Sequence, residues 1–183
     1  PQPFSAHGLL NVTSGYVGDS TRPVYAIRPG ATGDITLTET EQRDDHVAWY
    51  DETAGPYHPT PLVYGNYYFT LQDRGFFTVH DATTGEELYF TEQQIQTQEV
   101  RRRIAPGATG FTASPWAYNG RIFVLSEDGD TYVLDSENSF RVLATNSLEE
   151  VAMSSPAIAR GSLFIRTRSH LWRLTGALYA GAP

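Results

Sequence analysis

The chain has 183 residues, of which 40% are hydrophobic and 19% charged, a composition typical of one folded domain rather than of a disordered segment. Twenty-one acidic residues against 13 basic ones give a formal net charge of −8, which disfavours broad binding to nucleic acid. Cysteine and lysine are absent, which excludes disulfides, thiolate metal sites and chemistry that depends on a lysine amine. No apolar run is long enough to form a membrane-spanning helix.

Short runs of β-branched and aromatic residues alternate with glycine turns along the chain, a pattern that predicts an all-β fold. Residues 91–104 form the one segment compatible with a helix, and a long loop fits them equally well. The predicted strands, in chain order, are Leu9–Thr13, Val24–Arg28, His46–Tyr50, Pro61–Tyr64, Tyr67–Leu71, Phe76–His80, Glu87–Phe90, Ser114–Tyr118, Ile122–Ser126, Thr131–Leu134, Phe140–Ala144, Ala157–Ala159, Leu163–Thr167 and His170–Leu174.

Three segments of the chain repeat one pattern. Residues 60–69, 114–124 and 155–165 each begin with a hydroxyl residue followed by proline. Each then passes through a turn containing glycine into a strand of aromatic and aliphatic residues. Successive prolines of these segments lie 54 and 41 residues apart. The chain is therefore expected to contain internal repeats.

A second set of positions gives the same spacing. Phe77, Tyr132 and Trp172 occupy equivalent places in the strands that follow, 55 and 40 residues apart. A diverged upstream copy, residues 23–33, aligns with residues 75–85. Because two independent registers agree, the chain is predicted to hold four copies of one unit.

A unit of about 40 residues with four short strands is typical of the blade of a β-propeller. We therefore expect one domain over residues 1–183, a propeller or half-propeller made of about four four-stranded antiparallel blades. The expected units are approximately 8–50, 58–92, 111–146 and 153–175, with insertions at about 38–45 and 93–106.

The repeat resembles the pyrroloquinoline-quinone-type β-propeller repeat. The stretch Asp81-Ala82-Thr83-Thr84-Gly85 matches the hairpin of that repeat well, and residues 28–33 match it more loosely. Tyr89 and Trp49 stand where the repeat has its outer-strand tryptophan. The resemblance covers roughly residues 8–175. It extends to bacterial secreted propellers described as quinone-binding-like, relatives of the outer-membrane-assembly lipoprotein propeller.

This resemblance implies a fold more strongly than an activity, because the repeat is a packing unit. Quinone enzymes of the superfamily hold their cofactor and Ca²⁺ at the axis of a complete ring, and their best-known members carry a vicinal cysteine pair. This chain has no cysteine and no segment that matches their catalytic or calcium-binding residues. No cofactor is therefore expected.

No catalytic or metal-binding residues are predicted either. The acidic stretch at residues 127–130 lies where a hairpin turn belongs and lacks the spaced ligands of a calcium loop, so we interpret it as a turn. Zinc would require several histidines to converge, whereas these are scattered along the chain. The histidines are His7, His46, His58, His80 and His170.

An interaction surface is predicted from aromatic and basic residues near loops and insertions. Tyrosine is enriched in protein interfaces, and Tyr57 lies in a proline-rich connection that is expected at the surface. Packing between blades is the alternative role for the aromatic residues, and a solvated loop the alternative for the arginines. The candidate residues are Trp49, Tyr50, Tyr57, Arg101, Arg102 and Arg103.

Four blades amount to about half a ring of the seven or eight that the resemblance implies. The two end blades would then expose apolar faces, so a protein partner, a second copy or another segment of the parent protein is expected to complete or extend the propeller. The expected function is a non-catalytic scaffold for protein interaction or assembly in the periplasm or outside the cell. The alternatives are a fragment of a quinone-dependent or sugar-handling enzyme and a filament or surface-layer subunit.

Overall fold

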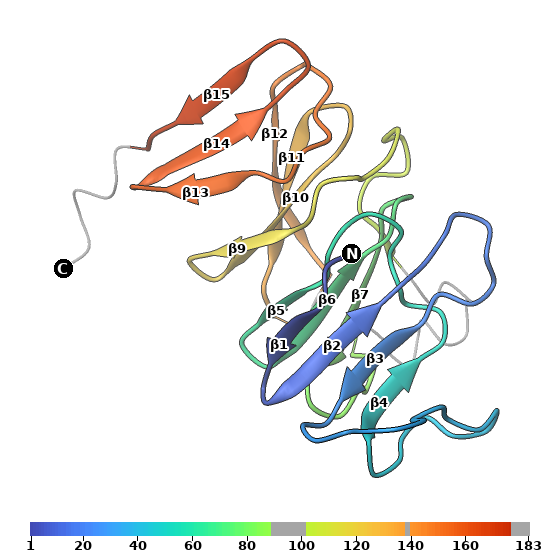
Figure 1. Ribbon diagram of the computed structural model, residues 1–183. Helices are drawn as coiled ribbons and strands as arrows, with labels where there is room; N and C mark the ends of the chain where they lie inside the picture. The colour runs from blue at the N-terminus through green and yellow to red at the C-terminus, as the bar shows by residue number, and fades with distance from the viewer. Residues whose placement is uncertain (89–101, 138–139, 177–183) are drawn as a thin grey trace.

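The computed structural model describes residues 1–88, 102–137 and 140–176, and it consists of four antiparallel sheets that follow one another along the chain (Figure 1). The expected all-β fold of four consecutive propeller blades is confirmed. The described part of the chain contains no helix that could cross a membrane. The first blade consists of β1 (Phe4–Ala6), β2 (Leu9–Thr13), β3 (Val24–Ile27) and β4 (Val47–Asp51), and the second of β5 (Leu62–Tyr64), β6 (Tyr67–Leu71), β7 (Phe76–Asp81) and β8 (Arg102–Arg103). The third blade consists of β9 (Trp116–Tyr118), β10 (Arg121–Leu125), β11 (Asp130–Asp135) and β12 (Val142–Ser147). The fourth consists of β13 (Ala157–Ala159), β14 (Ser162–Arg166) and β15 (Leu171–Leu174).

The first blade differs from the expected unit in where it begins, and the fourth in its number of strands. The first blade begins earlier than residue 8, because β1 pairs with β2 through a turn at His7 and Gly8, both with positive φ. The fourth blade has three strands among the described residues, in the order β13, β14, β15. A three-residue strand such as β1 is too short to show a period in the sequence.

The outer strand of the second blade is divided by the second insertion. Glu87 forms an antiparallel bridge with His80, and the Leu88 amide donates to the Val79 carbonyl at 2.8 Å. β8 then pairs with the start of β7. Residues 102 and 103 were expected inside the insertion at 93–106, but they belong to the sheet. The rest of the predicted strand at 87–90 lies partly outside the described residues.

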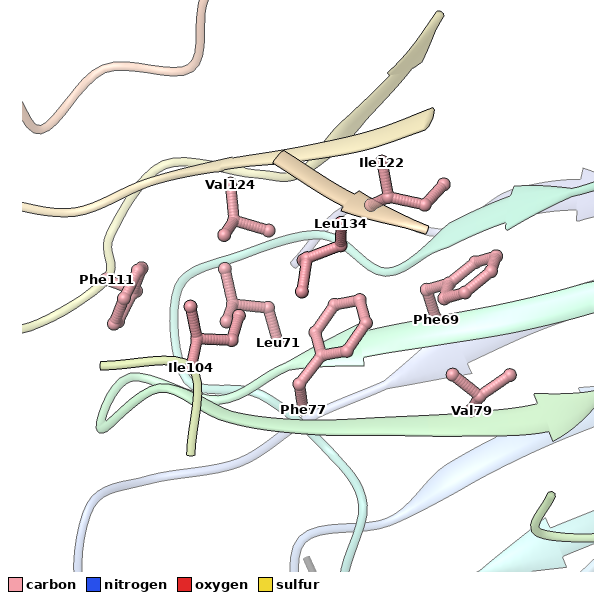
Figure 2. Packing of buried hydrophobic residues seen from close by; sticks show 9 residues of the cluster. All are labelled: Phe69, Leu71, Phe77, Val79, Ile104, Phe111, Ile122, Val124 and Leu134. Carbon is pink, nitrogen blue, oxygen red and sulfur yellow. The ribbon is translucent and has the colours of Figure 1, made fainter. Parts of the chain in front are cut away.

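Three hydrophobic clusters join the four blades in sequence. Trp49 packs with Tyr68 and Ala82 between the first and second blades. The largest cluster lies between the second and third blades, where side chains of β6 and β7 face those of β10 and β11 (Figure 2). Leu125 and Ile165 belong to the cluster between the third and fourth blades. Burial of one face of each sheet against the next is what stabilises stacked blades.

The hydroxyl of each Ser-Pro or Thr-Pro pair joins one blade to the next. The amide of Gln2 donates to Thr60 Oγ1 at 2.9 Å, the amide of Thr60 to Ser114 Oγ at 2.9 Å, and the amide of Ser114 to Ser155 Oγ at 2.8 Å. We call these bonds the inter-blade hydroxyl contacts. They explain why the repeat begins with a small hydroxyl residue, since a buried or half-buried amide requires an acceptor.

Glu150 attaches the connection between the third and fourth blades to the β14–β15 turn. Its carboxylate accepts hydrogen bonds from the Ser169 amide at 2.7 Å and the Thr167 hydroxyl at 2.5 Å, and lies 3.0 Å from His170 Nδ1. Hydrogen bonds from Ser169, then Thr167 and His170, lower the pKa of Glu150 from 4.5 to about 2.

This lowered pKa predicts an acid-dependent loss of stability. Because the folded state favours the charged carboxylate, the stabilisation is present above pH 4.5 and disappears as the pH falls towards 2. We expect the wild type to exceed Glu150→Gln in unfolding free energy at pH 7, and the difference to shrink between pH 4.5 and 2. Urea denaturation of both proteins across this range measures it, with Glu149→Gln as the matched control. A constant difference across the range would contradict the prediction.

Candidate functional site

Trp49 lies inside the protein rather than on an exposed surface. It is 2% exposed, its ring stacks on His80 at 5.8 Å and meets Tyr68 edge-on at 5.2 Å, and its Nε1 donates to the Ala82 carbonyl at 3.1 Å. The structure therefore corrects the sequence interpretation of Trp49 as an interaction residue. It supports the alternative, in which the outer-strand aromatic packs against the neighbouring blade.

Tyr50 instead belongs to an apolar face that no described sheet covers. Leu10 pairs with Ile27 and Val12 with Tyr25 across β2 and β3, while the Tyr25 and Tyr50 rings lie 4.8 Å apart. These five residues alternate along their strands with the side chains packed on the second blade, so they form the opposite side of the sheet. We call them the outer face of the first blade. Burial, then the nearby Tyr25, raises the pKa of Tyr50.

The fourth blade has a similar uncovered side. Trp172 packs on the third blade, so its neighbour Leu171 points away from it and is 68% exposed. Phe164 lies between two residues packed on the third blade and faces the same way as Leu171. Arg173 is paired with Phe164, and Arg166 with Leu171. We call these four residues the outer face of the fourth blade, and Figure 1 shows no sheet beyond it among the described residues.

The remaining candidate residues do not form one surface with Tyr50. Tyr57 is half-buried, with its ring 5.1 Å from Tyr16 and 3.8 Å from His58. Arg103 lies over the Phe76 ring at 5.4 Å and donates from Nε to the Arg74 carbonyl at 3.0 Å. Arg101 and the side chain of Arg102 lie outside the described residues.

The acidic stretch at residues 127–130 forms a hairpin turn, as the sequence interpretation holds. Asp128 accepts from the Thr109 amide at 2.8 Å and from the Thr109 hydroxyl at 2.6 Å, and these bonds lower its pKa. Glu127 accepts from the Thr112 hydroxyl at 2.5 Å. Both carboxylates therefore attach the turn to the connection that precedes the third blade.

The sequence analysis missed one cluster of residues whose side chains could bind a metal ion. Asp51, His80 and Glu87 each place a possible ligand atom within 4.8 Å of the others. His80 Nε2 lies 3.1 Å from Asp51 Oδ2, and Glu87 also lines a groove of about 440 Å³ beside Trp49 and Tyr50. The three residues come from the ends of strands in two blades. Asp51 and His80 are 29 residues apart in the sequence and come together through the packing of adjacent blades, which no local motif shows.

Comparisons with solved structures identify the fold. The chain is similar to BamB from Moraxella catarrhalis, with a TM-score of 0.57 and 14% identity over 88% of this chain and 41% of that one. It is similar to a europium-containing methanol dehydrogenase, with a TM-score of 0.51 and 16% identity over 78% of this chain and 23% of that one. The designed protein Ika4 aligns with 95% of this chain and 89% of its own, at a TM-score of 0.58 and 11% identity.

No family model matches the chain, and no curated protein matches its sequence. The chain spans 41% of the BamB chain and 23% of the methanol dehydrogenase chain, so it corresponds to a part of each propeller. These identities are too low to transfer an activity. The comparisons and the four sheets together show that the chain has a β-propeller fold like that of the quinone-type proteins.

Proposed function

We propose that this chain is a non-catalytic propeller scaffold that acts outside the cytoplasm and assembles through its two uncovered blade faces. The observation that carries the proposal is the outer face of the first blade, where five apolar or aromatic side chains stand in register on an uncovered sheet. The faces that pack blade against blade within the chain are likewise made of apolar and aromatic side chains. The natural occupant is therefore another blade.

The outer face of the fourth blade is a suitable counterpart. Phe164 and Leu171 provide apolar area, and Arg166 and Arg173 flank them. Arginine guanidinium groups pack well on tyrosine rings such as those of Tyr25 and Tyr50. A second copy could therefore place its fourth blade against the first blade of its neighbour and complete a larger ring.

The location outside the cytoplasm rests on the resemblance of the repeat to secreted propellers. The interaction role rests on the uncovered faces and on the likeness in fold to BamB. The parent protein could supply the further blades in place of a second copy, and the experiment below distinguishes these sources.

Light scattering of the purified chain after size-exclusion chromatography tests the proposal. We expect a species of at least twice the 20.3 kDa of one chain, and we expect Leu10→Glu or Leu171→Glu to shift it towards the monomer. Met153→Glu is the matched control, because Met153 is 55% exposed and lies in the connection between the third and fourth blades. Circular dichroism verifies that each variant keeps its β structure.

Electron microscopy separates a closed ring from a filament, and both outcomes support assembly through the blade faces. A stable monomer of the wild type that also fails to bind the remaining segment of a longer parent protein would overturn the proposal. Association that resists both glutamate substitutions would overturn it as well.

A further inference from the structure

We propose that Asp51, His80 and Glu87 bind a divalent transition-metal ion between the first and second blades. Asp51 ends β4, His80 lies near the end of β7, and Glu87 begins the strand segment that pairs with His80. The fold therefore brings three metal-ligating side chains together from two blades. One imidazole with two carboxylates is a donor set suited to ions such as Zn²⁺ or Mn²⁺.

The spacing of the three groups fits an ion. Zinc bonds of about 2.0–2.2 Å place neighbouring ligand atoms roughly 3.3–3.6 Å apart. His80 Nε2 and Asp51 Oδ2 are already 3.1 Å apart, and the three ligand atoms all lie within 4.8 Å of one another. Small side-chain rotations are enough to close this set on an ion. Asp51 is held in place because its other oxygen, Oδ1, accepts the Thr53 and Ala54 amides at 2.7 and 2.8 Å.

The burial of His80 fixes the imidazole at this cluster. The residue is 1% exposed, and its ring stacks on Trp49 at 5.8 Å. Histidines that bind metals use one ring nitrogen for the ion, and Nε2, which lies beside Asp51 Oδ2, is the nitrogen that an ion here would contact.

The position of the cluster also provides a route for the ion. Glu87 lines the groove of about 440 Å³ together with Glu86, Gln42 and Arg43. Trp49, whose ring stacks on His80, lines the same groove. A cation that enters the groove therefore lies beside Glu87, next to an imidazole whose orientation is fixed by packing.

Isothermal titration calorimetry with ZnCl₂, MnCl₂ and CaCl₂ on chelator-treated, dialysed protein tests the proposal. We expect one Zn²⁺ per chain, with Ca²⁺ at least tenfold weaker because imidazole is a poor calcium ligand. Glu87→Gln is expected to weaken zinc binding at least tenfold, and His80→Gln to abolish it. The zinc-induced rise in melting temperature should disappear in the same variants.

His170→Gln is the matched control, because it removes a histidine that lies 3.0 Å from a single carboxylate, that of Glu150. Its zinc affinity should equal that of the wild type. If His80→Gln fails to fold, the half-buried Glu87 still provides the test. Absence of saturable zinc binding, wild-type affinity in Glu87→Gln, or an equal loss in His170→Gln would each overturn the proposal.

Discussion

Replacing Gly129 with alanine is expected to lower the free energy of unfolding by about 3 kcal/mol or more. Gly129 has a φ of +90°, which an L side chain adopts only with strain. A Cβ there would also lie 2.2 Å from the Glu150 carbonyl oxygen and 3.1 Å from its carbon. The clash is with backbone, so it cannot be relieved by rotating a side chain.

Gly120→Ala is the matched control for this change. Gly120 also occupies a hairpin turn of the third blade with positive φ, +69°, but nothing lies within 4 Å of the added Cβ. It should therefore show the backbone strain alone, about 1–2 kcal/mol. Urea denaturation compares the two variants, and equal losses would contradict the packing argument.

Trp49→Ala is expected to destabilise the protein by about 3–5 kcal/mol, because it removes a fully buried aromatic side chain from the boundary of two blades. The change leaves a cavity between Tyr68 and His80 and deprives the Ala82 carbonyl of its hydrogen bond from Nε1. Trp49→Phe should recover part of the loss, since a ring remains but the indole N–H does not.

Tyr118→Ala gives the comparison for an aromatic residue that is not buried. Tyr118 is 55% exposed, so its removal should change the unfolding free energy by no more than about 0.5 kcal/mol. Thermal or urea denaturation measures all three variants. A loss in Trp49→Ala no greater than that in Tyr118→Ala would show that Trp49 does not join the blades.

Much of the fold was predictable because the repeat fixes both strand order and spacing. The Ser-Pro and Thr-Pro positions mark the start of three inner strands, and the turns at Gly65 and Gly120 mark their hairpins. β1 was missed because it has three residues and precedes the first recognisable copy. β8 was missed because the insertion separates it in the sequence from Glu87, although both pair with the same strand, β7.

The side-chain environments were less predictable than the strands. Trp49 and Tyr50 are adjacent in sequence, yet one is buried between blades and the other lies on an uncovered face. Composition near a loop cannot distinguish them, whereas the alternation of a strand does so once its register is known. The grouping of Asp51 with His80 depends on how two blades stack, a long-range property that spacing along the chain does not contain.

The inter-blade hydroxyl contacts have a direction. The first, second and third blades each offer a backbone donor to the next blade, through Gln2, Thr60 and Ser114. The second, third and fourth blades each offer a hydroxyl acceptor, so all three bonds run from the earlier blade to the later. The Ser155 amide is the next donor in this order. An added blade that continues the pattern must therefore present its acceptor to the fourth blade, so two copies joined in this way meet head to tail. A symmetric contact of fourth blade with fourth blade would place donor beside donor, which gives the assembly a defined polarity.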